Sequence, residues 1–281
     1  MELTLGVTLA VLGAGLLHAG WNALVKSAGG GDPLLDTATI VAGGTACALV
    51  FLPFVPPPLA QSWPFAMASV VIHFGYYLTL AQAYRTGDLS FAYPLMRGTA
   101  PLLVTLLGVV FLQELPAPQV MVGVLLICSG IFAIAFAQRR HHPRAAVYWA
   151  LANAAIIAVY TFVDGTGARL SGNALSYVLW LTFFEGIVFI AWIRWHRGRA
   201  SVAYLRAQWR RGLLGGFCSI AAYAIVLWAM TRAPLAAVSA LRETSVLFAA
   251  IIGTLILKEG FGLVRLVGAA TVVAGVAALK L

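Results

Sequence analysis

Apolar residues dominate this chain in ten long runs, which short polar or charged connections separate. Each run is about 20 residues long, the length that a helix needs to cross the hydrocarbon core of a bilayer. The few polar side chains inside the runs recur at helical spacing. We therefore predict ten transmembrane helices at residues 4–26, 34–57, 64–84, 88–113, 117–138, 146–168, 173–195, 209–231, 234–257 and 261–279.

One stretch of the chain occurs twice. Residues 86–123 and residues 231–268 align without a gap, and they agree at an arginine, a glutamate and two glycines in one register. Chance similarity between apolar helices would not produce these matches, so we interpret the stretch as an internal duplication. The equivalent pairs are Thr86 and Thr231, Ala92 and Ala237, Arg97 and Arg242, Thr99 and Thr244, Gly108 and Gly253, Glu114 and Glu259, and Gly123 and Gly268.

A basic linker at residues 139–145 separates five predicted helices from the next five. Because five is an odd number, two homologous halves must cross the membrane in opposite directions, as the inverted repeats of secondary transporters do. We therefore expect an all-α integral membrane protein of ten transmembrane helices. Its first five-helix repeat is predicted at residues 1–138 and its second at residues 146–281, with a substrate site between them.

Composition agrees with a membrane protein. The chain has 281 residues, of which 62% are hydrophobic and 10% charged, and its mean hydropathy is +0.93. Water-soluble domains average about 25% charged residues. The net charge of +9 does not indicate nucleic acid, because the cations lie in short loops beside tryptophans. The three cysteines occupy separate apolar runs without metal-ligand spacing, so we expect no metal site.

The loop cations are distributed unevenly between the two sides of the membrane. With the loops counted alternately, most of them lie on one side, and Arg169, Arg232 and Lys280 lie on the other. The positive-inside rule assigns the cation-rich side to the cytoplasm. We therefore predict a multi-pass protein of a bacterial-type inner (cell) membrane, with both termini outside the cytoplasm. The oligomeric state stays open, with a monomer as the simplest case.

Polar side chains within the apolar runs indicate a cavity. Arg97 and Arg242 lie roughly 12 Å deep along their helices. A cation at such a depth usually faces a bundle interior or a wet cavity. The candidate substrate-binding residues are Trp21, His73, Tyr76, Tyr77, Tyr93, Arg97, Tyr160, Tyr223, Trp228 and Arg242, and the further candidates for lining or coupling are His18, Asn22 and Glu243.

Two of these groups have a structural alternative. The arginines could pair with Glu243 or another buried acid, and the aromatic residues could serve only packing and interhelical hydrogen bonds. We expect the two arginines to differ. Arg97, which follows Tyr93 and a proline, is predicted to meet the solute, whereas Arg242 is predicted to be neutralised locally by Glu243.

Three further acids have other expected positions. Asp164 lies near the end of its helix, so we place it at the membrane interface beside Arg169. Glu114 is predicted to border a helix end without touching a solute, as is its repeat equivalent Glu259. Glu185 lies within an apolar run, and the sequence identifies no partner for it.

The five-plus-five duplication, the LQE and LKE sequences at Glu114 and Glu259, and the tryptophan region around Trp21 resemble the drug/metabolite transporter superfamily, in its EamA-type branch. The resemblance covers essentially the whole chain and extends to exporters of aromatic amino acids. It implies a secondary transporter, an exporter of small amphipathic metabolites, that works by alternating access. Amino acids, including aromatic ones, are the first expected substrates. Many relatives have their termini inside the cytoplasm, so the charge pattern implies a reversed orientation here.

Two alternatives to amino acid transport remain. A transporter of anionic phosphorylated or phosphonate metabolites is favoured if both arginines face the cavity, because guanidinium groups bind phosphate bidentately. A lipid scramblase or a membrane enzyme is the other. The sequence lacks a nucleophile with its base, a metal-ligand cluster and a phosphate-cradling glycine loop, so we expect no catalytic residues and no cofactor. The expected partners are a small-molecule substrate and the lipid bilayer, without nucleic acid.

Overall fold

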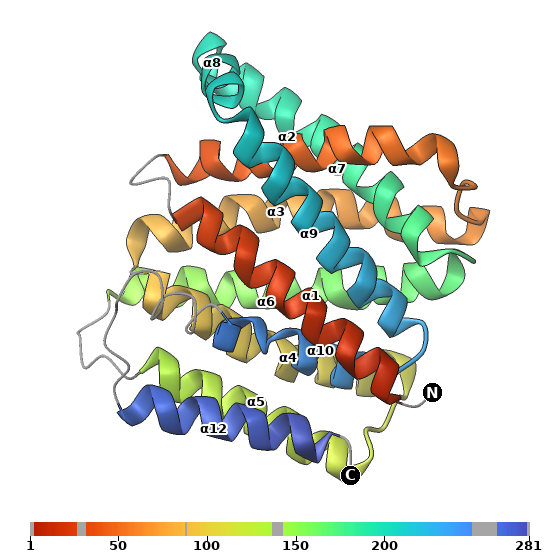
Figure 1. Ribbon diagram of the computed structural model, residues 1–281, viewed down its shortest axis with the longest axis vertical. Coiled ribbons are helices and arrows are strands. Elements are labelled where there is room, and N and C mark those ends of the chain that lie inside the picture. Colours follow the sequence, from red (N-terminus) through yellow and green to blue (C-terminus); the bar gives the residue numbers. More distant parts are fainter. Residues whose placement is uncertain (1–2, 27–31, 88, 137–142, 249–262, 280–281) are drawn as a thin grey trace.

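The computed structural model describes residues 3–26, 32–87, 89–136, 143–248 and 263–279. These ranges form an α-helical bundle (Figure 1). The α-helices are α1 (Leu5–Lys26), α2 (Pro33–Phe51), α3 (Trp63–Thr86), α4 (Leu89–Leu112), α5 (Pro118–Ala135), α6 (Arg144–Leu170), α7 (Ala174–Arg197), α8 (Arg199–Ala207), α9 (Trp209–Met230), α10 (Leu235–Arg242) and α12 (Leu263–Ala278). Two 3₁₀ turns, η1 (Leu52–Phe54) and η2 (Ala60–Ser62), lie between α2 and α3.

The all-α membrane class is confirmed. Among the described residues, seven helices are long and apolar enough to cross a membrane, namely α2 to α7 and α9. α1 and α12 contain shorter apolar stretches, at Leu5–Trp21 and Leu266–Ala278. Each coincides with a run that the sequence predicts as a membrane segment. The repeat residues Gly253 and Glu259 and most of the linker lie outside the described residues.

The prediction of one continuous helix at residues 234–257 is wrong. α10 ends at Arg242, and a turn at Glu243 and Thr244 precedes helical backbone that starts again at Ser245. In the turn, the Thr244 backbone N–H bonds to the Leu241 carbonyl at 3.1 Å, and the Thr244 hydroxyl donates to the same oxygen at 2.7 Å. A threonine hydroxyl that competes for a carbonyl in this way is a known cause of local helix distortion.

The basic stretch after α7 is also more structured than predicted. It contains α8, whose polar and apolar residues separate onto two faces. Figure 1 shows α8 at one extremity of the bundle, beyond the end of α7. The stretch therefore forms a short amphipathic helix, of the kind that lies along a membrane surface.

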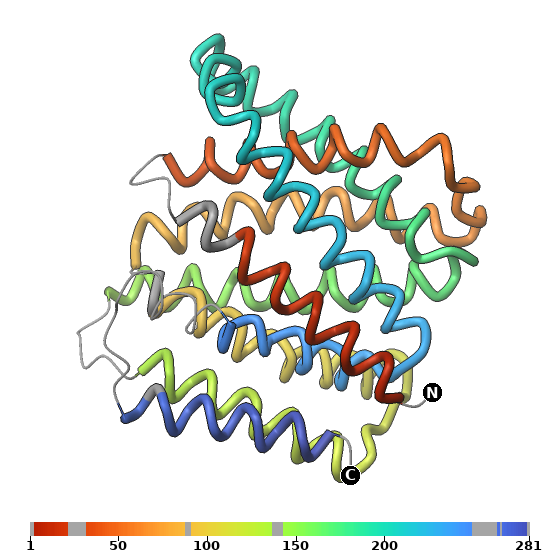
Figure 2. Tube along the Cα trace, in the orientation of Figure 1, coloured from red at the N-terminus to blue at the C-terminus, as the bar shows by residue number. Residues whose placement is uncertain are grey.

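Helices of the first half of the chain pack mainly against helices of the second half. α3 lies along α6, and α1 lies along α9. α2 packs on both α7 and α9, and α5 lies along α12 at one edge of the bundle (Figure 1). The two halves are therefore interleaved. The tube in Figure 2 shows both chain ends on one side of the molecule.

Glycines allow the closest of these contacts. A Cβ atom added to Gly123 would lie 2.9 Å from the Gly275 carbonyl oxygen, and one added to Gly130 would lie 2.6 Å from that of Gly268. The α5–α12 contact thus uses glycines at both of its crossing points. Between α2 and α9, a Cβ atom on Gly43 would overlap the Gly212 carbonyl group. Small residues at such positions let helix backbones approach closely in a membrane.

We expect Gly43→Ala to lower the free energy of unfolding, because backbone atoms of α9 occupy the space of the new methyl group. Overpacking usually costs about 1–3 kcal/mol, and we expect a loss of at least that order. Gly13→Ala in α1 is the matched control, since a Cβ atom there would meet nothing within 4 Å. Thermal unfolding of the purified proteins in detergent measures both. Equal melting of the two variants would show that the α2–α9 contact is not a close constraint.

Candidate functional site

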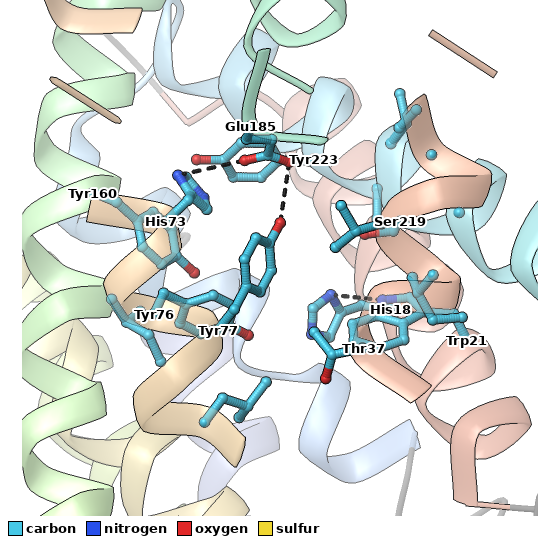
Figure 3. Close-up of a pocket in the computed structure, with 18 of the residues that line it drawn as sticks. His18, Trp21, Thr37, His73, Tyr76, Tyr77, Tyr160, Glu185, Ser219 and Tyr223 are labelled. Atoms are coloured by element: carbon cyan, nitrogen blue, oxygen red, sulfur yellow. Dashed lines mark hydrogen bonds and ion pairs between the residues drawn. The ribbon is translucent and has the colours of Figure 1, made fainter. Parts of the chain in front are cut away.

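A cavity of about 300 Å³ lies between the two halves of the bundle (Figure 3). Its lining comes from α1, α2, α3, α4, α6, α7, α9 and α10. Residues near the ends of several helices take part, namely Trp21 of α1, Asp36 of α2 and Tyr84 of α3. These ends adjoin the loops that carry most of the cations. The cavity therefore extends from the middle of the bundle toward its cation-rich side.

Most of the predicted site residues lie together in this lining. Trp228, Asn22 and Glu243 do not belong to the lining that the structure describes. The predicted residues that line the cavity are His18, Trp21, His73, Tyr76, Tyr77, Tyr93, Arg97, Tyr160, Tyr223 and Arg242.

Each of those three exceptions has a separate position. Trp228 lies on α9 near the opposite side of the bundle, where its ring centroid is 4.9 Å from the guanidinium carbon of Arg232. The side chain of Asn22 lies outside the described part of the structure. Glu243 is fully buried behind the cavity wall, in contact with both arginines.

The two arginines share Glu243 as their counter-ion. Arg97 Nε lies 2.6 Å from Glu243 Oε2. Arg242 Nε donates to Glu243 Oε1 at 3.1 Å, and its Nη2 approaches the Thr161 hydroxyl at 3.4 Å. The two side chains are 4% and 5% exposed. The prediction that only Arg242 would be neutralised by Glu243 is therefore wrong, because the turn after α10 places the carboxylate between both guanidinium groups.

This cluster carries one more positive than negative charge. Among the described residues, Glu243 is the carboxylate that forms ion pairs with both arginines. The Nη2 of Arg97 and the hydroxyl of Tyr93 are both buried without a hydrogen-bond partner there. A buried charge without its own partner is costly. The cavity wall thus offers an unsatisfied guanidinium edge beside an aromatic ring, whose centroid lies 5.7 Å from the Arg97 guanidinium carbon.

A second polar cluster faces the same cavity from α3 and α7. Figure 3 shows Glu185 between His73 and Tyr77. The Tyr77 hydroxyl donates to Glu185 Oε1 at 3.1 Å, and His73 Nδ1 lies 3.7 Å from Glu185 Oε2. The His73 ring stacks on Tyr160 of α6 with a centroid distance of 4.4 Å. Glu185, for which the sequence identified no partner, is therefore part of the site.

Asp164 is not at the interface, so that prediction is wrong. It is fully buried in the middle of the bundle, where it accepts hydrogen bonds from the hydroxyls of Tyr177, at 2.9 Å, and Tyr223. Arg169, its expected partner, instead pairs with Glu114 at 2.5 Å. Because α6 extends to Leu170, Asp164 lies more than a turn from the helix end.

Arg169 joins several segments on the side of the bundle opposite the cavity. Its Nη1 contacts Glu114, its Nε donates to the Met230 carbonyl at 2.8 Å and its Nη2 to the Ala233 carbonyl at 3.2 Å. One side chain thus joins α6 to the connections after α4 and α9. Glu114 follows the end of α4 and does not belong to the described lining of the cavity.

The cation-rich side has its own polar contacts at the rim of the cavity. The Tyr204 hydroxyl of α8 donates to Asp36 at 2.8 Å, and Arg197 pairs with Asp32 at 2.8 Å. Partial burial and the Asp36 carboxylate raise the pKa of Tyr204 to about 12. The hydroxyl therefore remains a donor at physiological pH, and it connects α8 to the start of α2.

Comparison with known proteins now identifies the fold and the family. A family model described as "EamA-like transporter family" matches residues 4–136 and again residues 144–281. The chain belongs to the EamA-like transporter family. No curated protein matches the sequence significantly. A solved structure titled "Crystal structure of protein" is similar over 97% of this chain and 96% of its own, with a TM-score of 0.77 and 19% sequence identity. That likeness supports the fold alone.

This EamA-like transporter is accordingly a multi-pass integral membrane protein and not an enzyme. Each half of the chain matches the family model separately.

We expect Glu243→Gln to be the most destabilising of the changes to the arginine cluster, by about 3–5 kcal/mol, because it leaves two buried guanidinium groups without a counter-ion. Arg97→Gln and Arg242→Gln each leave a one-to-one pair and should cost less. Thermal unfolding of the purified variants ranks them.

The control is Glu114→Gln, which removes a carboxylate that is 29% exposed while Arg169 keeps two carbonyl partners. It should cost about 1 kcal/mol or less. If either arginine variant melts below Glu243→Gln, the shared counter-ion does not control the cluster.

Proposed function

We propose that this EamA-like transporter is a secondary transporter that exports small amphipathic metabolites, amino acids including aromatic ones first, by alternating access. The observation that carries the proposal is the cavity between the halves, where one surplus guanidinium charge stands opposite tyrosine, histidine and tryptophan rings. A planar guanidinium edge binds a carboxylate well, and the aromatic rings provide apolar and cation-binding faces.

Charge balance favours an amino acid over a phosphorylated solute. Within the part of the chain that the structure describes, the arginine cluster has one uncompensated positive charge, which one carboxylate would neutralise. A phosphate or phosphonate dianion would leave an excess negative charge in a buried site, at a considerable cost. The volume of about 300 Å³ lies at the lower end of the range for small-molecule pockets, which is about 300–1,000 Å³. Phosphorylated metabolites remain the alternative if both guanidinium groups turn toward the solute.

The architecture proposed for this function is ten transmembrane segments in two inverted repeats. The helix pairing supports this architecture, because each main contact between the two halves has an equivalent contact in which the two repeats have changed places. Gly123 and Gly130 of α5 are equivalent to Gly268 and Gly275 of α12, and the observed contacts are Gly123 with Gly275 and Gly130 with Gly268. A two-fold relation between antiparallel helices produces this crossed pattern.

The proposed orientation puts the cation-rich side, and therefore the open end of the cavity, in the cytoplasm. The protein would lie in an inner (cell) membrane with both termini outside, and the two chain ends on one side of the molecule support an even number of crossings (Figure 2). In this state an exporter would accept its solute from the cytoplasm. Arg169 would hold the outer side closed.

The decisive test of substrate class uses thermal stabilisation by phenylalanine, phenethylamine and phenyl phosphate, since anything that binds the native state raises its melting temperature. We expect phenylalanine to stabilise most, because it has both the carboxylate and the amine. Arg97→Lys should reduce the affinity for phenylalanine by about 1–3 kcal/mol, because the ammonium group keeps the charge but loses the bidentate geometry.

Arg232→Lys is the matched control, since Arg232 lies at Trp228, away from the cavity. It should leave phenylalanine binding unchanged. Stabilisation by phenyl phosphate above that by phenylalanine would favour the phosphorylated class instead.

The orientation is tested with single cysteines in a variant without Cys47, Cys128 and Cys218. A cysteine at Ser219, which lines the cavity, should react with an impermeant thiol reagent applied from the cytoplasmic side only. One at Ser239, which is fully buried, should resist from both sides. Labelling of the Ser219 position from outside would reverse the proposed orientation.

A further inference from the structure

His73 lies close to two carboxyl groups that belong to different helices. Its ring lies beside Glu185 of α7, with 3.7 Å between Nδ1 and Oε2. Asp164 of α6 interacts electrostatically with His73, and it is bonded to the hydroxyl of Tyr223, whose ring centroid lies 6.1 Å from that of His73. The Ser69 hydroxyl lies 2.9 Å from His73 Nδ1. These side chains place Glu185, His73 and Asp164 in one polar cluster.

The partners of His73 indicate where its hydrogen lies. Besides the Ser69 hydroxyl, Nδ1 faces the Ser69 carbonyl oxygen at 3.1 Å and Glu185 Oε2. A carbonyl oxygen can only accept a hydrogen bond. The arrangement therefore favours a hydrogen on Nδ1, which leaves the other ring nitrogen as a hydrogen-bond acceptor.

Of the two carboxyl groups, Glu185 is the one that reaches the cavity in the described part of the chain. Glu185 lines the cavity, and its side chain is 12% exposed. Asp164 is fully buried and does not belong to the described lining. It contacts Tyr177 on its far side and the cavity residue Tyr223 on its near side. A proton that enters from the cavity would thus meet Glu185 first and Asp164 behind it.

Among the described residues, no arginine or lysine forms an ion pair with Glu185. The groups that face it are as follows. From α3 they are His73 and Tyr77, and from α6 they are Asp164 and Tyr160. α9 contributes Tyr223, whose hydroxyl is bonded to Asp164. The acid of α2, Asp36, lies at the rim and is bonded to Tyr204.

The arginines of the site do not compensate Glu185, because their ion-pair contacts are with Glu243. Two carboxyl groups therefore share one histidine. Both carboxyl groups cannot be ionised at low cost, and a buried acid in this situation binds a proton.

We propose that Glu185 is a proton-binding site through which this transporter couples solute export to proton entry, with His73 and Asp164 as the groups that share the proton. When a solute ammonium group approaches Glu185, the proton leaves to cavity water and the carboxylate pairs with the ammonium. When the solute leaves, Glu185 takes up a proton again and stays neutral while the empty protein changes conformation. The inference rests on the proposed transport function.

Infrared titration of the purified protein without any solute tests the proton site directly. We expect an absorption of a protonated carboxyl group that disappears as the pH rises. Glu185→Gln should remove a titrating part of that absorption, whereas Glu114→Gln should not, because Glu114 is paired with Arg169. Tyr77→Phe removes a hydrogen bond to Glu185 and should move the titration midpoint to higher pH, since the lost bond stabilises the carboxylate.

Proteoliposomes with radiolabelled phenylalanine test the coupling. The wild-type protein should accumulate phenylalanine several-fold when the lumen is more acidic than the outside, because protons then leave as the amino acid enters. Glu185→Gln should not accumulate it, and any exchange that remains should no longer depend on pH.

Three results would count against the proposals in different ways. An infrared titration that Glu185→Gln and Tyr77→Phe leave unchanged would overturn the proton site, provided both variants melt near the wild-type temperature. Phenylalanine exchange by the wild type that never responds to a pH gradient would overturn coupling. If the wild type does not exchange phenylalanine at all, the proposed substrate class is wrong, and the infrared result still decides whether Glu185 binds a proton.

Discussion

The interior of this transporter depends on one carboxylate. Glu243 balances two guanidinium groups in a setting where an uncompensated ion costs several kcal/mol. Arg97 comes from the first half of the chain, whereas Arg242 and Glu243 come from the second. The same interaction therefore keeps the cluster buried, joins the halves beside the cavity and, among the described residues, leaves one surplus positive charge there. The aromatic lining and the acid cluster on α3, α6 and α7 are arranged around that charge.

Most of the fold follows from hydrophobicity read along the chain. A membrane-length apolar run has few options besides a helix, because its backbone groups must bond within the segment. Runs such as Pro118–Ala135 accordingly appear as helices near their predicted bounds. The break after Arg242 could not be read in the same way, because no proline or glycine marks it. It arises where Thr244 competes for a carbonyl and two adjacent charges need room to interact.

The candidate site was predictable where it depends on helical spacing and not where it depends on contacts between remote helices. His73, Tyr76 and Tyr77 share a helix face, and all three line the cavity. Nothing near Glu185 in the sequence indicates Tyr77, which lies on another helix. Asp164 was misplaced for a similar reason, since its donor Tyr223 lies on α9. The sequence signal for both residues was a lone acid within an apolar run. Such an acid indicates that a partner is needed, but it does not identify the partner.

The turn at Glu243 and Thr244, which separates α10 from the helical backbone that starts at Ser245, changes what the backbone itself contributes. In an uninterrupted helix the peptide dipoles align head to tail, so partial charges remain only at the two distant ends. Here α10 ends within the bundle at Arg242, and helical backbone starts again at Ser245. Arg242 lies in the last turn of α10, beside the partially negative end, and Glu243 precedes the partially positive start of the next helical turn. Each of the two neighbouring side chains thus has a favourable peptide dipole as well as an ionic partner, so the interrupted backbone is itself an electrostatic component of the cavity wall.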